Sequence, residues 1–262
     1  MDLGLDGRVA VVAAASKGLG RAVAEELAAE GAAVVLCARG REALDAVVGA
    51  IAARGGRAHG VVADVSRPDD VARVVAEAER AFGTVGILVT NSGGPRSGRF
   101  ETLSPADWDA ATRVLLSSAV AFTHAVLPGM RARRWGRILH ITSIAAKQPV
   151  DGLMLSNSLR SAVTAFARTL ANEVAADGIT VNCLMPGYTR TERVVDLSAE
   201  MAAAEGVSPE AITARWEQEI PMRRLGEPRE FAALAAFLAS SRATYITGQS
   251  IAVDGGWIRH VL

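Results

Sequence analysis

The segment Ala13–Gly20 has residue types and spacing suited to binding a phosphate-bearing ligand. It reads Ala-Ala-Ala-Ser-Lys-Gly-Leu-Gly and separates an apolar run from a stretch of helical periodicity. Glycines in such a turn let the backbone approach a ligand, and the N–H groups that open the next helix can receive a pyrophosphate. Gly18 and Gly20 alone are a weak signal, but their place between a strand and a helix strengthens it. The residues predicted to bind the ligand are Ala14, Ser16, Lys17, Gly18, Leu19 and Gly20.

Short apolar runs alternate with helical periodicity along the whole chain, and these elements must position the turn. The expected strands are 8–13, 33–38, 58–63, 87–90, 138–142, 179–184 and 250–253. The expected helices are 19–30, 41–54, 68–82, 105–133, 156–176 and 228–238. This alternation requires parallel strands with right-handed crossovers, and the nearly continuous Val, Ile and Leu of the strands suits burial on both faces. We predict an α/β fold: a doubly wound parallel sheet (Rossmann fold) of about seven strands, with helices on both faces.

The chain is predicted to form a single dinucleotide-binding domain over residues 1–262. Its length is near the upper limit for one hydrophobic core, and no Pro/Gly/Ser-rich linker divides it. Residues 189–221 interrupt the alternation, and Ser208-Pro209-Glu210 marks a helix start there. We expect this segment to be a substrate lid at the carboxyl edge of the sheet; a plain surface excursion is the alternative.

Composition narrows the classes of partner. The formal net charge is zero, whereas nucleic-acid binders usually carry a basic excess, so we expect no nucleic-acid partner. We find no apolar stretch of the roughly 18 to 20 residues that span a bilayer, and no signal-peptide pattern, so we expect a cytoplasmic protein without a membrane partner. Cys37 and Cys183 lie in apolar runs and are interpreted as small buried residues, which leaves no predicted metal site.

Further motifs follow the glycine turn in a fixed order. They are Asp64-Val65, Asn91-Ser92-Gly93, Pro186-Gly187 with Thr189 and Thr191, Thr247-Gly248-Gln249, and Val253-Asp254-Gly255-Gly256. With the turn, they resemble the short-chain dehydrogenase/reductase family over almost the whole chain. The runs at 91–94 and 155–158 are similar to a branch of 3-oxoacyl-(acyl-carrier-protein) reductase-like proteins with an imperfect cofactor motif and catalytic tetrad.

The resemblance implies roles for these motifs at a nicotinamide dinucleotide. Asp64 and Val65 correspond to the adenine contact, Asn91 and Gly93 follow the fourth strand, and the segment with Pro186, Gly187, Thr189 and Thr191 folds over the nicotinamide. The turn departs from the family pattern, because Ala13 and Ala14 stand where the family has Thr and Gly. If position 14 needs a positive φ, alanine costs about 1 kcal/mol there.

Charge favours NADP(H) over NAD(H). A carboxylate at the end of the second strand would bind the ribose diol of NAD, whereas a base there tolerates the 2′-phosphate of NADP. That strand ends at Arg39 without a carboxylate, and Lys17 lies on the facing turn. The alternative is that Lys17 and Arg39 are two solvated surface bases.

Most of the family's catalytic tetrad is missing. By the resemblance, Ser143 holds the position of the family's Ser, but Ser156 replaces the Tyr, Arg160 the Lys and Leu115 the Asn. The chain contains no Tyr-x-x-x-Lys sequence. A Ser hydroxyl is far less acidic than a phenol, and loss of a general acid typically costs a factor of about 10² to 10⁴ in rate. Arg160 could still hold a ribose, but it cannot relay protons.

Lys147 is the candidate replacement, since it lies four residues beyond Ser143 on the loop after the fifth strand. A desolvated lysine can act as an acid near neutral pH or anchor an anionic substrate; a solvated loop lysine is the alternative.

Three functions stay open at this point. The first is an oxidoreductase, dependent on NADP(H), that acts on a small-molecule carbonyl or alcohol with a non-standard proton donor. The second is a nucleotide-binding regulatory protein without redox chemistry, and the third is a lyase or isomerase in the same pocket. The resemblance also implies a homo-oligomer, either a dimer or a tetramer.

Overall fold

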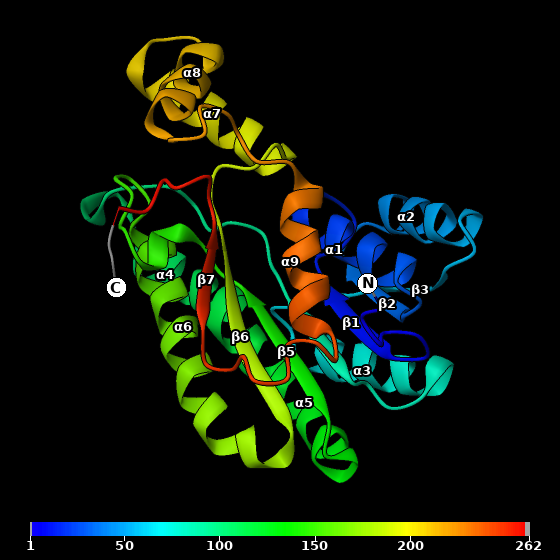
Figure 1. Cartoon of the computed structure of the whole chain (residues 1–262). Helices are drawn as coiled ribbons and strands as arrows, with labels where there is room; N and C mark the ends of the chain where they lie inside the picture. Colours follow the sequence, from blue (N-terminus) through cyan, green and yellow to red (C-terminus); the bar gives the residue numbers. More distant parts are fainter. Residues whose placement is uncertain (1, 260–262) are drawn as a thin grey trace.

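The structure is a computed structural model that describes residues 2–259, and within this range seven parallel strands form one sheet between two helical layers (Figure 1). The strand order is β3-β2-β1-β4-β5-β6-β7. The strands are β1 (Val9–Ala13), β2 (Ala33–Ala38), β3 (Arg57–Val62), β4 (Ile87–Thr90), β5 (Gly136–Ile141), β6 (Ile179–Pro186) and β7 (Ser250–Val253). The chain reverses its direction of winding between β1 and β4, and ligands of such sheets bind at this switch point, outside the carboxyl ends of the strands. The predicted doubly wound fold is confirmed.

The helices follow the predicted alternation closely. They are α1 (Gly18–Ala29), α2 (Arg41–Ala53), α3 (Pro68–Phe82), α4 (Pro105–Thr112), α5 (Ser118–Arg133), α6 (Met154–Val174), α7 (Glu192–Glu205), α8 (Pro209–Glu219) and α9 (Pro228–Ala239). Short turns of other helix types are η1 (Phe100–Thr102), η2 (Arg113–Ser117), η3 (Ile144–Ala146) and η4 (Ala175–Asp177).

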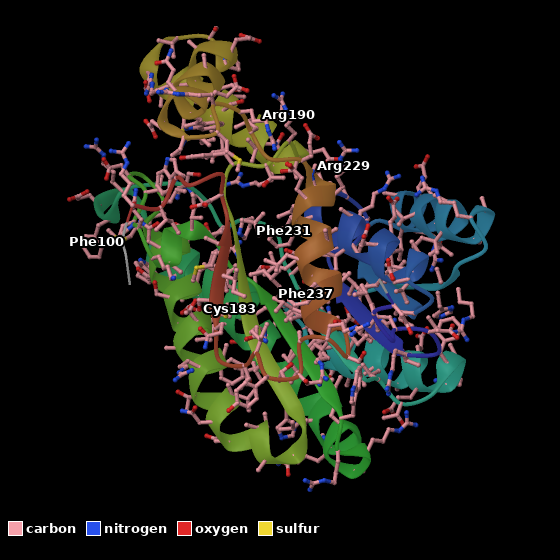
Figure 2. All side chains as sticks on the ribbon, viewed as in Figure 1. Phe100, Cys183, Arg190, Arg229, Phe231 and Phe237 are labelled. Atoms are coloured by element: carbon pink, nitrogen blue, oxygen red, sulfur yellow. The ribbon has the colours of Figure 1, made fainter. Side chains whose placement is uncertain are left out.

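Alternate residues of the central strands supply two separate hydrophobic cores. Val12 of β1 faces the layer of α1, α2 and α9, whereas Val11 faces the layer of α3, α5 and α6. Phe231 and Phe237 of α9 pack in the first of these layers, and Cys183 lies within β6 (Figure 2). Burial of a side chain the size of Phe231 contributes about 1.5–3 kcal/mol.

Both cysteines are buried and free, as the sequence predicts. Burial raises the pKa of the Cys37 thiol to about 12 and that of Cys183 to about 11. Both therefore stay protonated at neutral pH and behave as small core residues.

The predicted helix 105–133 contains one irregular turn. Its middle, η2, is a π-helix between α4 and α5, and such turns often occur at functional sites. By length and composition this is the one described helix that could cross a membrane. It packs against the sheet through Phe122, Val126 and Met130, as a core helix does.

Residues 189–221 form a helical hairpin that projects from the carboxyl edge of the sheet (Figure 1). Ser208 caps α8, because its side chain accepts a hydrogen bond from the Ala211 N–H, so the predicted helix start is correct. Helix α7 was not predicted; its N-cap, Thr191, makes no side-chain capping hydrogen bond. The hairpin shares a small core with β6, η3 and the segment after β7, and in this core the ring of Trp216 stacks on Tyr188 with their centroids 4.5 Å apart.

Candidate active site

The turn between β1 and α1 is braced by close backbone packing. A Cβ atom on Gly20 would lie 2.4 Å from the carbonyl oxygen of Ala14 and 2.8 Å from Nδ2 of Asn91, so only glycine fits. Asn91 donates a hydrogen bond from Nδ2 to that same carbonyl oxygen at 3.3 Å. The end of β4 thus holds the glycine turn in place and leaves the start of α1 open for an anion.

Ala14 has a left-handed backbone, with φ of 48°. Position 14 therefore has the positive φ at which the sequence analysis expects an alanine to be strained. A residue with a Cβ pays about 1–2 kcal/mol in this conformation. Gly18, with φ of 55°, supplies the second left-handed position without that cost.

Two glycines keep the segments around the turn in close contact. Gly187, after β6, lies so close to Asp254 that a Cβ would be 2.7 Å from the Asp254 Cα. Thr191 is the N-cap of α7 and faces the turn, since a Cβ on Gly18 would lie 3.6 Å from the Thr191 Cβ. A side chain at Gly187 would therefore clash with Asp254, whereas a Cβ at Gly18 would be in ordinary van der Waals contact with Thr191.

A backbone bridge holds Thr189 against the segment that precedes α9. Thr189 is buried and pairs with Gly226 in a parallel bridge, and its hydroxyl donates to the Gly187 carbonyl oxygen at 3.3 Å. Pro186 ends β6. The segment with Pro186, Gly187, Thr189 and Thr191 thus leads directly from the sheet to the hairpin.

The two bases predicted to select the cofactor are both exposed at the carboxyl ends of β1 and β2. Lys17 precedes α1 and Arg39 follows β2. The Asp64 carboxylate accepts hydrogen bonds from the Ser66 N–H and hydroxyl, which lower its pKa, and the charge of Arg39 lowers it further. No carboxylate ends β2, as the sequence predicts. The other predicted cofactor residues lie at the same edge: Ser16, Leu19 and Val65 are half-buried, and Gly93 is exposed.

Ser156 and Arg160 are brought together on α6. Arg160 donates from Nε to the Ser156 Oγ at 3.2 Å, and from Nη1 to the carbonyl oxygens of Ile141 and Thr142 at 3.1 and 2.8 Å. The guanidinium therefore links the serine to the end of β5, one residue before Ser143.

Arg160 has no carboxylate partner among residues 2–259. Burial lowers its pKa to about 10, and the positive charge of Arg193 adds to this shift. Arg160 is still protonated at neutral pH, so it adds an uncompensated positive charge to the pocket.

Two hydroxyls at this site are set to donate hydrogen bonds. The Ser143 Oγ accepts from the Ala145 N–H at 3.1 Å, and the Ser156 Oγ accepts from Arg160, so each keeps its own proton for another acceptor. A small cavity of about 10 Å³ lies nearby, at the ends of β4 and β5. Its lining residues, among which neither Ser143 nor Ser156 is found, are Thr90, Asn91, Ser92, Leu115, Ser118, Ile141, Thr142, Arg160 and Val163.

Leu115 lies in the π-turn and packs against Leu155 and Leu159. An apolar side chain there ends any proton relay through this position, as the sequence indicates.

Lys147 is exposed at the end of η3. The burial that a lysine acid would need is therefore not found. Two interpretations of Lys147 stay open: it attracts an anionic substrate, or it is a solvated loop lysine.

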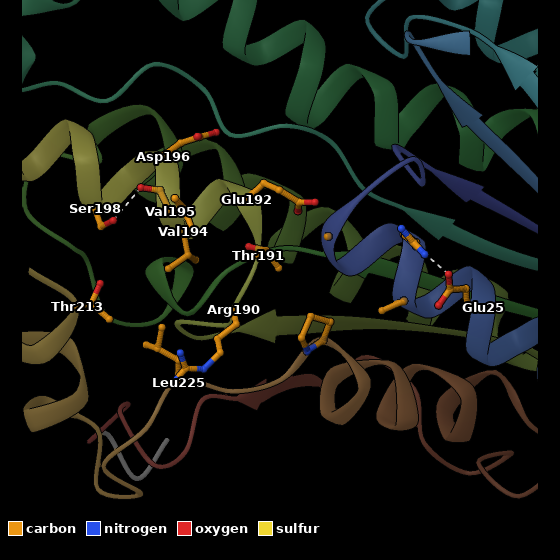
Figure 3. Close-up of a pocket in the computed structure, with 14 residues that line it drawn as sticks. Glu25, Arg190, Thr191, Glu192, Val194, Val195, Asp196, Ser198, Thr213 and Leu225 are labelled. Atoms are coloured by element: carbon orange, nitrogen blue, oxygen red, sulfur yellow. Dashed lines mark hydrogen bonds and ion pairs between the residues drawn. The ribbon is translucent and has the colours of Figure 1, made fainter. Parts of the chain in front are cut away.

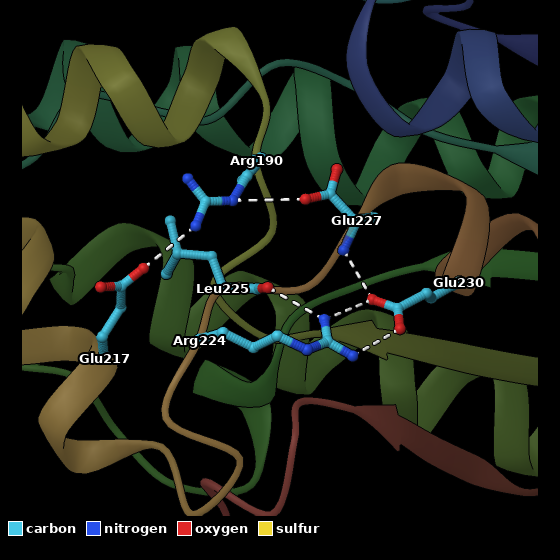
Figure 4. Close-up of polar contacts among 6 residues, drawn as sticks. All are labelled: Arg190, Glu217, Arg224, Leu225, Glu227 and Glu230. Atoms are coloured by element: carbon cyan, nitrogen blue, oxygen red, sulfur yellow. Dashed lines mark hydrogen bonds and ion pairs between the residues drawn. The ribbon is translucent and has the colours of Figure 1, made fainter.

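Sequence reasoning missed a cleft of about 800 Å³ between α1 and the hairpin (Figure 3). It shares Gly18 and Thr191 with the glycine turn, and its other walls come from α1, α7, α8 and the start of α9. Arg190 lines the cleft and pairs with Glu217 at 3.1 Å and with Glu227 at 3.3 Å (Figure 4). These exposed ion pairs join α8 to α9, each with modest energy.

Comparison with known proteins shows similarity over nearly the whole chain. A sequence profile described as enoyl-(acyl carrier protein) reductase matches residues 13–258. Dehydrogenase/reductase SDR family member 4 of Oryctolagus cuniculus is 35% identical over 253 residues, 96% of this chain and 94% of that protein. The 3-oxoacyl-(acyl-carrier-protein) reductase of Vibrio cholerae is 33% identical over 254 residues, 97% of this chain and 98% of the relative. L-sorbose reductase of Gluconobacter frateurii, solved with NADPH and L-sorbose, superposes with a TM-score of 0.94 at 35% identity and covers 100% of both chains.

Proposed function

This chain belongs to the short-chain dehydrogenase/reductase family of oxidoreductases, and from that membership we propose that it uses NADP(H) to reduce a small-molecule carbonyl, or to oxidise the corresponding alcohol, with a proton donor other than tyrosine. The observation that carries the proposal is the glycine turn. Gly20 fits against Ala14 and Asn91 with no room for a side chain, which is the geometry that a pyrophosphate-binding turn requires.

The preference for NADP(H) rests on the charges beside the turn. Lys17 and Arg39 are exposed at the strand ends where the adenosine ribose would lie, and no carboxylate stands at the end of β2 to bind a ribose diol. The structurally similar L-sorbose reductase was solved with NADPH, which supports the same choice.

The hydroxyls of Ser143 and Ser156 are proposed to hydrogen-bond the carbonyl oxygen. When bound, NADPH supplies the hydride. Arg160 fills an acceptor position of Ser156 and brings a positive charge close to the alkoxide that develops, and electrostatic stabilisation of this kind contributes several kcal/mol in enzymes. The proton itself then comes from water, because neither serine is acidic enough to release one.

The hairpin of α7 and α8 is proposed to be the substrate lid. Thr191, the N-cap of α7, faces the glycine turn, and Arg190 pairs with Glu227, the N-cap of α9. The lid can therefore respond to a ligand at the turn.

Titration of the purified protein with NADPH and with NADH tests the cofactor assignment. We expect tighter binding of NADPH, and a loss of that preference in Arg39→Asp. Arg54→Asp, at the other end of α2, is the control and should keep it. Equal affinities in the unaltered protein, or an unchanged preference in Arg39→Asp, would contradict the assignment.

One observation favours a second candidate, a nucleotide-binding protein without redox chemistry. Arg160 is bonded to two β5 carbonyls, and both Tyr and Lys of the tetrad are replaced. Tight NADPH binding without oxidation of NADPH by any carbonyl compound would favour this candidate.

A further inference from the structure

The segment between β5 and α6 carries Ser143 and is held to α6 by the side-chain amide of Asn157. Asn157, near the start of α6, donates from Nδ2 to the Val150 carbonyl oxygen at 2.9 Å. Its Oδ1 accepts from the Val150 N–H at 3.3 Å. We call these two hydrogen bonds the amide clamp. Because one side chain satisfies both backbone groups of Val150, which is half-buried, the clamp fixes the position and the orientation of the segment there.

Helix α6 holds this segment on both sides of Ser143. Arg160 bonds to the last two carbonyl groups before Ser143, and Asn157 bonds to Val150 after it. Asn157 also follows Ser156 directly in the chain. The amide clamp therefore ties the segment of one proposed substrate-binding serine to the helix that carries the other.

The Ser143 hydroxyl depends on the position of the short turn η3. Its Oγ accepts from the Ala145 N–H at 3.1 Å, and the Ser143 carbonyl oxygen accepts from the Ala146 N–H at 3.0 Å. A shift of the chain after η3 would carry these amides, and the hydroxyl bonded to one of them, away from Ser156. Asn157 opposes such a shift by holding Val150.

The same segment is joined to the loop after β4. The Gly152 carbonyl oxygen accepts from the Gly98 N–H at 2.7 Å, and Gly98 pairs with Leu153 in a parallel bridge. The β4 loop is a separate element, and its own motion could pull on the segment. The amide clamp lies between this junction and Ser143, so it shields the serine from that motion.

We propose that Asn157 is a positioning residue for carbonyl reduction, because it holds the Ser143 hydroxyl in place relative to that of Ser156. This inference rests on the proposed reductase function. Asn157 acts through Ser143 and does not contact the reacting atoms. It also gives a role to the asparagine in the Leu-Ser-Asn-Ser run at 155–158.

The kinetic test compares Asn157→Ala and Asn157→Asp with Ser158→Ala, an exposed control on the same turn of α6. Asn157→Ala removes both hydrogen bonds, and kcat should fall by about 10- to 100-fold, the scale for a misplaced catalytic group. NADPH affinity should stay unchanged, because the glycine turn lies beside β1. Ser158→Ala should change neither quantity.

Asn157→Asp separates positioning from a general loss of structure. Its carboxylate cannot donate to the Val150 carbonyl oxygen, whereas the protonated acid can both donate and accept, as the amide does. Activity relative to the unaltered protein should therefore recover as the pH falls. Asn157→Ala should show no such recovery.

Hydrogen–deuterium exchange of the whole protein, without and with NADP⁺, gives a readout that needs no turnover. The Ala145 N–H is bonded to the Ser143 hydroxyl, so its exchange reports whether that hydroxyl is held in place. In Asn157→Ala, exchange at Ala145 and at Val150 should become about 10-fold faster or more, because the segment opens more often. In Ser158→Ala both rates should stay unchanged.

Three results would overturn the inference. They are unaltered kcat in Asn157→Ala, faster exchange that is confined to Val150, and a relative activity of Asn157→Asp that does not depend on pH. Failure of the proposed function looks different. Exchange at Ala145 then rises in Asn157→Ala as expected, so the clamp on Ser143 stands, yet the unaltered protein oxidises NADPH with no carbonyl compound.

Discussion

Replacement of Ala14 by glycine should stabilise the protein, although glycine usually destabilises. Ala14 has a φ of 48°, a conformation that costs a residue with a Cβ about 1–2 kcal/mol. Glycine removes this strain but makes the unfolded chain more flexible, at a cost of about 0.4–1 kcal/mol. The net gain expected for Ala14→Gly is about 0.5–1 kcal/mol, which is a rise of about 1–4 °C in Tm for a chain of this size.

Thermal and urea unfolding of Ala14→Gly measure this gain, with Ala13→Gly as the matched control. Ala13 lies in β1 and is fully buried, so its replacement should lower stability by about 0.5–1 kcal/mol. NADPH affinity should be kept or improved in Ala14→Gly, because the turn no longer has to hold a strained residue. A fall in stability for Ala14→Gly comparable to that for Ala13→Gly would refute the argument from backbone strain.

The other predictions concern the pocket and the adenine side of the site. Ser156→Tyr combined with Arg160→Lys should raise carbonyl reduction by about 10-fold or more, since it restores a phenol acid and its lysine; no gain on any carbonyl in a folded, NADPH-binding variant would show that the pocket itself has diverged. Lys147→Met should raise KM for an anionic substrate and leave kcat unchanged, because Lys147 is exposed; a fall of about 10²-fold in kcat would instead make Lys147 the acid. Ser66→Ala should move the lowered pKa of Asp64 part of the way back to its ordinary range, which an NMR titration detects. A lowered carboxyl pKa stabilises the fold above the ordinary pKa of about 3.9 and is lost as pH falls through the lowered value, so Ser66→Ala should be less stable at pH 7 with the difference vanishing in strong acid.

The elements of the fold could be predicted because each has a local signal. Buried parallel strands read as continuous apolar runs, and α3 begins at Pro68, as expected from proline at the first helical position. Comparison of the glycine turn with the family pattern singled out position 14, where the structure then shows the left-handed backbone. The predicted start of α8 at Ser208 depended on a capping residue whose hydrogen bond is local.

The site was less accessible to such reasoning, because its contacts join residues far apart in the chain. The bonds from Arg160 to Ile141 and Thr142 depend on how α6 packs against β5, and no local pattern encodes them. Lys147 was singled out by its spacing from Ser143, but exposure is a property of the folded chain.

Transfer of deuterium from NADPH to a carbonyl carbon would show that the protein is a reductase. NADPH carrying deuterium at the transferable position of the nicotinamide is incubated with the protein and a panel of carbonyl compounds, and the products are analysed by mass spectrometry. We expect one deuterium on the former carbonyl carbon of at least one product. The rate should be lowered by Gly20→Ala, because the added Cβ would clash with Ala14 and Asn91. Tight binding of NADPH with no deuterium in any product would contradict the assignment as a reductase.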